Sequence, residues 1–346
     1  MNKSRTGSNN LITDVKNIFV GTAEDESLST GVTLIIGDKP FLAAVDVRGG
    51  GPGTKEIDLL HLENSIGRID AIVLSGGSAF GLDASSEIQK LLKEDKKGYL
   101  VGDNVIPLVP SAVIFDLISS NNYWKNGDSI WRLLAKKAYT SIKKSFPLGS
   151  VGAGYGATTS TLKGGQGSAS WRQKFSDNKY YTVGAIVINN SVGNPLINDG
   201  PHFLSGHLEI NNEFGGIGSS SKSFDGQVRA KRISNSYSNE FNTVIGVVAT
   251  DAPLSRSDLK RLAIMSHDGI ARSIHPSHTP MDGDTIFAIT NKIDSTQIKS
   301  QFQKSDLSIL GSLAADCVSR SCNRAVYEAK SITNINLRSW KDKFKN

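Results

Sequence analysis

Cysteine is scarce in this chain: only two of its 346 residues are cysteines, Cys317 and Cys322. They lie five residues apart in DCVSRSC, a stretch expected to be helical, and this spacing does not suit a disulfide. No neighbouring His or Cys completes a zinc-binding pattern. Low cysteine use is typical of a reducing compartment, so we expect a cytoplasmic protein.

Long apolar runs and concentrated charge are also missing. No stretch approaches the roughly 18 apolar residues of a membrane span, and MNKSRTGSNNLITDV at the start has no apolar segment of a secretory signal. The 39 basic and 33 acidic residues give a net charge of +6, and the basic residues are scattered. These absences predict no membrane span, no signal peptide and no nucleic-acid partner.

Glycine is abundant, with 34 residues that often cluster, as expected for tight turns and close backbone approaches. Apolar runs predict buried strands, and residues 31–54 predict a hairpin that turns at GDKP. Helical spacing follows Ser255, which with Asp258 forms a capping-box pattern, and it recurs over 297–329 with a possible break at Gly311. Strands and helices alternate without a strict rhythm, which suits helices packed outside a pair of sheets.

Two stretches invite functions that their details do not support. SGGSAFG (75–81) lies between a strand and a helix, as a phosphate-binding loop does, but it lacks the required glycine and Lys-Ser/Thr spacing. It is not a nucleophile elbow either, because Phe80 stands where that motif needs glycine. A group of His267, His275 and His278 could suggest a metal site, but the spacing is irregular and prolines interrupt any single helical face.

The stretch EFNTVIGVVATDAP (240–253) raises the question of a nucleophile, because Thr243 opens an apolar run that predicts a buried strand. A Thr hydroxyl is a weak nucleophile unless a base lies beside it, and the α-amine of an N-terminal Thr is one such base. Thr243 becomes N-terminal only if its hydroxyl attacks the carbonyl of Asn242 and the bond between them breaks. From these residues alone, a nucleophile and a plain strand start both stay open.

Several stretches, in the same order, resemble the autoprocessing L-aminopeptidase/D-esterase hydrolases, a family that includes β-aminopeptidases and nylon-oligomer hydrolases. They lie between about residues 31 and 290, and they are GVTLI, AAVDVRGGGPGT, DAIVLSGGSAFGLDA, VPSAVIFDL, GSVGAGYGATT, KGGQGSAS, VGAIVINN, NTVIGVVATDAPLS and HDGIARSIHPSHTPMDGDTIFAIT. The resemblance implies an αββα sandwich, with two sheets between helical layers, as in ornithine acetyltransferases. It also implies a single domain over 1–346 that cleaves itself into 1–242 and 243–346, which stay together.

The resemblance assigns roles to particular residues. Thr243 is implied as the N-terminal nucleophile and Asn242–Thr243 as the self-cleavage site. Lys163 in LKGGQG matches a position near the active site, where a desolvated Lys relays protons or stabilises charge.

Three further positions of the resemblance carry polar side chains. Asn190, with Asn189 beside it, matches an oxyanion donor. Asp282 and Asp284 match a polar pair that orients the nucleophile and its amine, and alternate residues at a strand start point the same way. This two-Asp version most resembles the nylon-oligomer hydrolases.

The implied activity is hydrolysis of an amide or ester with no metal or organic cofactor. The implied substrates are short peptides with a free N-terminus, β-amino amides, D-residue esters, or linear amide oligomers such as 6-aminohexanoate oligomers. The family implies homo-oligomers, tetramers or larger, of cleaved heterodimers. Phe115 stands where many relatives have a Tyr whose hydroxyl serves the oxyanion, and this departure favours a non-catalytic binding homologue. Acyl transfer to an amine, as in ornithine acetyltransferases, is the other alternative.

Overall fold

The computed structural model describes residues 6–117, 122–125, 127–231, 242–292 and 302–345. Its helices are α1 (Asp83–Glu94), α2 (Ile130–Thr140), α3 (Arg256–Ser273), α4 (Lys304–Tyr327) and α5 (Trp340–Phe344). Its strands are β1 (Ile18–Asp25), β2 (Thr30–Val47), β3 (Thr54–Lys55), β4 (Arg68–Ser75), β5 (Tyr99–Val101), β6 (Asn104–Ile106), β7 (Ser111–Val113), β8 (Trp124–Lys125), β9 (Asp128–Ser129), β10 (Gly165–Lys174), β11 (Tyr180–Asn190), β12 (Thr243–Thr250) and β13 (Thr285–Thr290).

The long strand β2 joins two groups of strands. The hydrogen-bonded order is β10-β11-β12-β13-β2-β4-β7-β3, with β1 also paired to β2. Along β2, β1 pairs with residues 30–37, β4 with residues between 32 and 42, and β13 with residues 42–47. The two sheets of the sandwich are therefore continuous through β2 in their hydrogen bonding.

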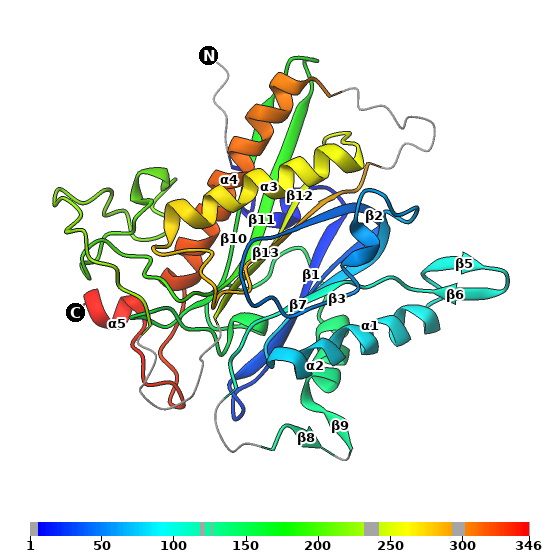
Figure 1. Cartoon of the computed structure of the whole chain (residues 1–346), viewed down its shortest axis with the longest axis horizontal. Coiled ribbons are helices and arrows are strands. Elements are labelled where there is room, and N and C mark those ends of the chain that lie inside the picture. Colours follow the sequence, from blue (N-terminus) through cyan, green and yellow to red (C-terminus); the bar gives the residue numbers. More distant parts are fainter. Residues whose placement is uncertain (1–5, 118–121, 126, 232–241, 293–301, 346) are drawn as a thin grey trace.

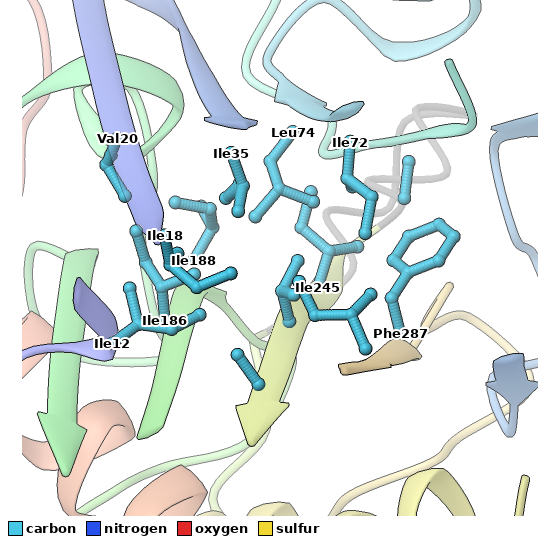
Figure 2. Close-up of a cluster of buried hydrophobic side chains, with 14 of the residues drawn as sticks. Ile12, Ile18, Val20, Ile35, Ile72, Leu74, Ile186, Ile188, Ile245 and Phe287 are labelled. Atoms are coloured by element: carbon cyan, nitrogen blue, oxygen red, sulfur yellow. The ribbon is translucent and has the colours of Figure 1, made fainter. Parts of the chain in front are cut away.

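Packing separates the molecule into four layers. One apolar cluster lies between the two groups of strands, and Figure 2 shows Ile186 and Ile188 of β11 facing Ile18 of β1 in this layer. A second cluster covers the outer face of β10–β13 with side chains of α3 and α4. A third covers the outer face of β1, β2 and β4 with α1 and α2, and Figure 1 shows both helical layers outside the strands. The predicted αββα sandwich is confirmed.

Both faces of β12 are covered by other layers, which explains why its sequence is a continuous apolar run. Val244 and Val248 face the α3/α4 layer, while Ile245 and Val247 face the layer between the sheets. Every residue of β12 is buried. Parallel pairing with β13, which follows α3, is the usual arrangement for two strands joined by a helix.

Two local predictions differ from the structure. Residues 31–54 were predicted to form a hairpin at GDKP, but β2 runs through this stretch as one strand with an irregularity between Ile36 and Phe41. The chain instead reverses between β1 and β2, at turn residues 26–29. No break occurs at Gly311, since α4 is continuous there. Within the described ranges, no helix is long and apolar enough to cross a membrane.

Candidate active site

Thr243 lies where three neighbouring strands end or begin. It is the first residue of β12, and it is the direct partner of Asn190, the last residue of the antiparallel strand β11. On the other side, Asn242 pairs with Asp282 just before the parallel strand β13. The register of the sheet therefore brings Asn190, Thr243 and the 282–284 turn to one edge, although they are far apart in sequence.

The Asn242–Thr243 peptide bond is intact and buried, with Asn242 2% and Thr243 4% exposed. The Thr243 hydroxyl donates a hydrogen bond to the carbonyl oxygen of Asn242. The same oxygen accepts the N–H of Gly283 at 3.0 Å, and the N–H of Asn242 donates to the carbonyl of Met281 at 3.2 Å. The hydroxyl thus contacts the peptide group that it is predicted to attack, and a backbone donor already polarises its carbonyl.

Asp284 holds the backbone next to Thr243. Its Oδ1 accepts the N–H of Val244 at 2.8 Å, and its Oδ2 accepts from the backbone N–H of His278 at 3.1 Å. The same Oδ2 lies 2.7 Å from His278 Nδ1. Asp284 is only 1% exposed. These partners hold its carboxylate in place, and the carboxylate in turn holds the backbone at the start of β12.

Asp282 lies close to Asp284 but contacts other groups. Its Oδ2 accepts from the N–H and hydroxyl of Thr279, at 2.9 and 2.7 Å, and its Oδ1 accepts the N–H of Val192 at 3.4 Å. Burial, and then the charge of Asp284, raise the pKa of Asp282. The two carboxylates therefore share one site, as expected, but their hydrogen bonds reach the loops around Thr243 rather than its hydroxyl.

The structure distinguishes the two neighbouring asparagines. Asn189 faces the helical layer, where its Nδ2 donates to the carbonyl of Cys322. Asn190 faces the candidate site: its Oδ1 accepts the N–H of Thr158 at 2.9 Å, and its Nδ2 donates to the carbonyl of Phe115 at 3.1 Å. An amide nitrogen carries two N–H groups, so one remains for an oxyanion. Phe115 contributes its backbone, not its ring, to this contact.

Lys163 is completely buried, and the charge of the buried Asp116 carboxyl acts on it, although these two described residues form no ion pair. Its ammonium donates to three carbonyl oxygens of one loop, those of Gly154, Ala157 and Gly164. Burial lowers the pKa of Lys163 to about 7, and the Asp116 charge opposes this shift. Burial likewise raises the pKa of Asp116 to about 7, against the N–H of Gly77, which donates at 2.7 Å.

Lys163 does not contact the predicted nucleophile directly. Among the hydrogen bonds of the described residues, none joins Lys163 to Thr243. The loop that Lys163 holds carries Thr158, whose N–H fixes Asn190. Lys163 thus contacts the loop that holds Asn190, the expected oxyanion donor.

The three histidines considered for a metal site separate in the structure. The rings of His267 and His278 are in edge contact, with centroids 5.0 Å apart, whereas His275 packs against Phe224. Within the part of the chain that the structure describes, no group of three or more His, Cys, Asp or Glu side chains is arranged to hold a metal. Burial lowers the pKa of His267 to about 4.

The sequence model of peptidase family S58 matches residues 10–339. The chain belongs to peptidase family S58. An uncharacterized aminopeptidase of Mycobacterium leprae is 36% identical over 344 residues, covering 94% of this chain and 92% of the relative. A 6-aminohexanoate-oligomer endohydrolase of Kocuria is 29% identical over 292 residues, covering 82% of this chain and 76% of the relative. This S58 chain is a hydrolase of peptide or amide bonds.

Solved structures share the fold of the S58 chain. The L-aminopeptidase D-Ala-esterase/amidase of Ochrobactrum anthropi, described as a variant of the Ntn hydrolase fold, matches with a TM-score of 0.71 and 21% identity. The match covers 97% of this chain and 91% of that one. A Burkholderia β-aminopeptidase matches with a TM-score of 0.69 and 19% identity, over 98% and 91% of the two chains.

The sequence does not reveal several residues that contact this S58 site. Gly283, which donates to the Asn242 carbonyl, has no functional signal in the sequence, and His278, which contacts Asp284, suggested only a metal site. Lys231 donates from Nζ to Thr158 Oγ1 at 2.6 Å and to the side-chain oxygen of Asn242. Lys231 lies outside every helix and strand, so tertiary structure alone reveals its contacts.

Proposed function

We propose that this chain is an autoprocessing amidohydrolase whose nucleophile is Thr243, exposed as an N-terminal residue by cleavage after Asn242. The observation that carries the proposal is the contact of the Thr243 hydroxyl with the Asn242 carbonyl, which Gly283 polarises. The hydrogen bond from Gly283 belongs to the parallel bridge between Asn242 and Asp282, so the feature particular to the proposal is the hydroxyl contact.

Self-cleavage follows from this contact in two steps. The Thr243 oxygen bonds to the carbonyl carbon of Asn242, the C–N bond breaks, and the nitrogen takes the hydroxyl proton to become an amine. The Asn242 acyl group is then an ester on Thr243, and water hydrolyses it to a carboxylic acid and the free hydroxyl. The N–H of Gly283 stabilises the negative oxygen that forms in the first step.

Turnover of a substrate uses the same nucleophilic oxygen. The freed α-amine of Thr243 accepts the hydroxyl proton as the oxygen attacks the substrate carbonyl, and it returns the proton to the departing amine. The second N–H of Asn190 Nδ2 serves the oxyanion, and Asp284 orients the nucleophile through Val244. Direct proton relay by Lys163 stays a prediction, since its contacts favour holding the loop.

Substrates in this proposal are short amides, in the classes that the sequence implies: peptides with a free N-terminus, β-amino amides and linear amide oligomers. Two relatives, an uncharacterized aminopeptidase and a 6-aminohexanoate-oligomer endohydrolase, support that range. The hydrolase relatives favour water over an amine as the acyl acceptor. Acyl transfer to ornithine is the alternative outcome that an activity assay would detect.

Assembly of this chain into a homo-oligomer is part of the same proposal. The β5–β6 hairpin projects from the body in Figure 1, and it exposes four large apolar side chains, Tyr99, Leu100, Val101 and Ile106, with Leu100 68% exposed. Such a surface is favourable to bury against another copy.

A cytoplasmic location rests on the low cysteine content alone and stays a prediction.

The intact mass of the protein under denaturing conditions tests the proposal. Wild type is expected to give two chains, 1–242 and 243–346, and Thr243→Ala a single chain of 346 residues. Thr243→Ser keeps a hydroxyl and is expected to cleave. A single wild-type chain, with no release of amine from any short amide, would contradict the proposal and favour a non-catalytic homologue.

A further inference from the structure

The side chain of Asn242 lies in a small polar subsite of its own. Its amide oxygen accepts a hydrogen bond from Lys231 Nζ, which also donates to Thr158 Oγ1 at 2.6 Å. The backbone N–H of Lys231 donates to the carbonyl of Val192 at 2.9 Å, which anchors the lysine to the chain segment following β11. Asn242 is 2% exposed, and its contact with the Lys231 ammonium is partly buried.

Asn242 is also the acyl residue of the self-cleavage reaction. In that reaction its acyl group becomes an ester on Thr243 Oγ1 while the α-amine of Thr243 becomes free. Substrate turnover passes through the same kind of ester on the same oxygen, with the substrate acyl residue in place of Asn242. The surroundings of Asn242 in the uncleaved chain therefore represent those of the substrate acyl residue.

We propose, resting on the proposed function, that Lys231 and Thr158 form a specificity subsite for acyl residues with an oxygen on their γ-carbon, namely N-terminal Asn or Asp. The carboxylate of Asp accepts a charge-assisted hydrogen bond from the Lys231 ammonium where the Asn242 amide oxygen does so now. The substrate α-amine takes the place of the Asn242 N–H, which donates to the Met281 carbonyl at 3.2 Å.

The subsite discriminates against other acyl side chains for a physical reason. Leu has nearly the shape of Asn, but it offers no acceptor, so the partly buried ammonium of Lys231 loses a hydrogen bond. A cationic acyl side chain meets the ammonium with repulsion. Loss of a hydrogen bond to a charged group corresponds to roughly a ten- to hundredfold change in kcat/KM.

Wild-type kinetics on four amides test the inference without any variant. The p-nitroanilides of Asn, Asp, Leu and Ala are compared by kcat/KM, and the Asn and Asp amides are expected to exceed the Leu amide by roughly ten- to hundredfold. Equal turnover of the Leu and Asn amides overturns the inference while leaving the proposed function intact. Turnover of none of the four by a self-cleaved enzyme also overturns it, whereas failure of both cleavage and turnover overturns the proposed function.

Substitution of Lys231 identifies the source of the preference. Lys231→Met is expected to lower the Asn-to-Leu ratio of kcat/KM to near one, and Thr158→Val, which removes the second Lys231 contact, to lower it less. Lys222→Met, at an exposed lysine in the same polar segment, is the matched control and is expected to keep the wild-type ratio. A Lys231→Met enzyme that retained the wild-type ratio would exclude Lys231 as the determinant. If Lys231→Met fails to cleave itself, the wild-type comparison still decides.

Discussion

Gly283 lies opposite Thr243 at the point where β12 and β13 begin, and a β-carbon at position 283 would lie 2.9 Å from Thr243 Oγ1. The same β-carbon would lie 2.8 Å from the carbonyl oxygen of Gly51. The close approach on both sides explains a glycine here in physical terms: the backbone N–H must reach the Asn242 carbonyl while the hydroxyl keeps its space.

Gly283→Ala is therefore expected to slow self-cleavage strongly while most of the fold is kept, because the new methyl group displaces the hydroxyl from the Asn242 carbonyl. The measurement is the fraction of cleaved chain by intact mass over time after purification. Gly200→Ala is a suitable control, since its β-carbon meets only the Ile197 carbonyl, at 3.3 Å. Cleavage of Gly283→Ala at the wild-type rate would mean that the hydroxyl attacks from another position.

His278 is expected to position Asp284 rather than to exchange protons with substrate. His278→Ala removes the Nδ1 contact at 2.7 Å but keeps the backbone donor, so kcat is expected to fall roughly tenfold with little change in KM. Asp284→Ala also leaves the Val244 N–H without its acceptor and should be more severe. His275→Ala, at an exposed ring, is the control. An unchanged kcat in His278→Ala would remove His278 from the positioning network.

Lys163 and Asp116 are expected to depend on each other for stability. Lys163→Met removes the positive charge that favours the ionised form of the buried Asp116, so the free energy of unfolding is expected to fall. The double variant Lys163→Met/Asp116→Asn removes both charges while Asn can still accept from Gly77, so it should regain part of that stability. Urea unfolding in the uncleaved Thr243→Ala background measures both.

The pH dependence of this pair has a definite sign. The raised pKa of Asp116, about 7, means that the folded state prefers the neutral acid, so stability from this group is lost as pH rises from 3.8 toward 7. Without Lys163 the pKa of Asp116 rises further, and the loss continues above pH 7. The cost of Lys163→Met should thus be larger at pH 8.5 than at pH 6.5. Equal costs at both values would contradict an electrostatic dependence.

Apolar patterning predicted helices outside a pair of sheets, and the resemblance implied the αββα order of the layers. β12 and β13 read as buried strands because both faces of each are covered, and Ser255 caps α3 by accepting the Asp258 N–H, as its spacing predicts. The hairpin prediction at GDKP was wrong because local turn residues there interrupt the pairing of β2 without reversing the chain. Gly311 looked like a helix break, but its missing side chain instead makes room for Met265 of α3.

The candidate site was predictable only as a set of residues. The resemblance to known hydrolases placed Asn190, Thr243, Asp282 and Asp284 together, and the strand register shows why they meet. Their hydrogen-bond partners were not predictable, because contacts such as Lys231 with Asn242 depend on the course of irregular segments. Periodicity carries no information about such segments, whereas strand pairing is encoded in the apolar pattern.

His267 is expected to limit the stability of the protein in mild acid. It is 1% exposed, its Nε2 lies 3.0 Å from the Asp46 carbonyl, and its Nδ1 has no hydrogen-bond partner among the described residues. Protonation would place a proton on Nδ1 without an acceptor and a charge beside His278. The charges of Asp46 and Asp284 favour the protonated ring, but burial outweighs them and lowers the pKa of His267 to about 4.

The sign follows from linkage between protonation and folding. Above pH 6.5 the ring is neutral in both states, so it causes no pH dependence; as pH falls from 6.5 toward 4, only the unfolded chain takes up the proton. The free energy of unfolding should then fall by roughly 2–3 kcal/mol over this range, in addition to the effects of other groups. In the Thr243→Ala background, His267→Gln should flatten the slope between pH 6.5 and 4.5, whereas His207→Gln, at an exposed ring, should not. Equal slopes in the two variants would mean that His267 takes up its proton without unfolding, and that the edge contact with His278 tolerates the charge.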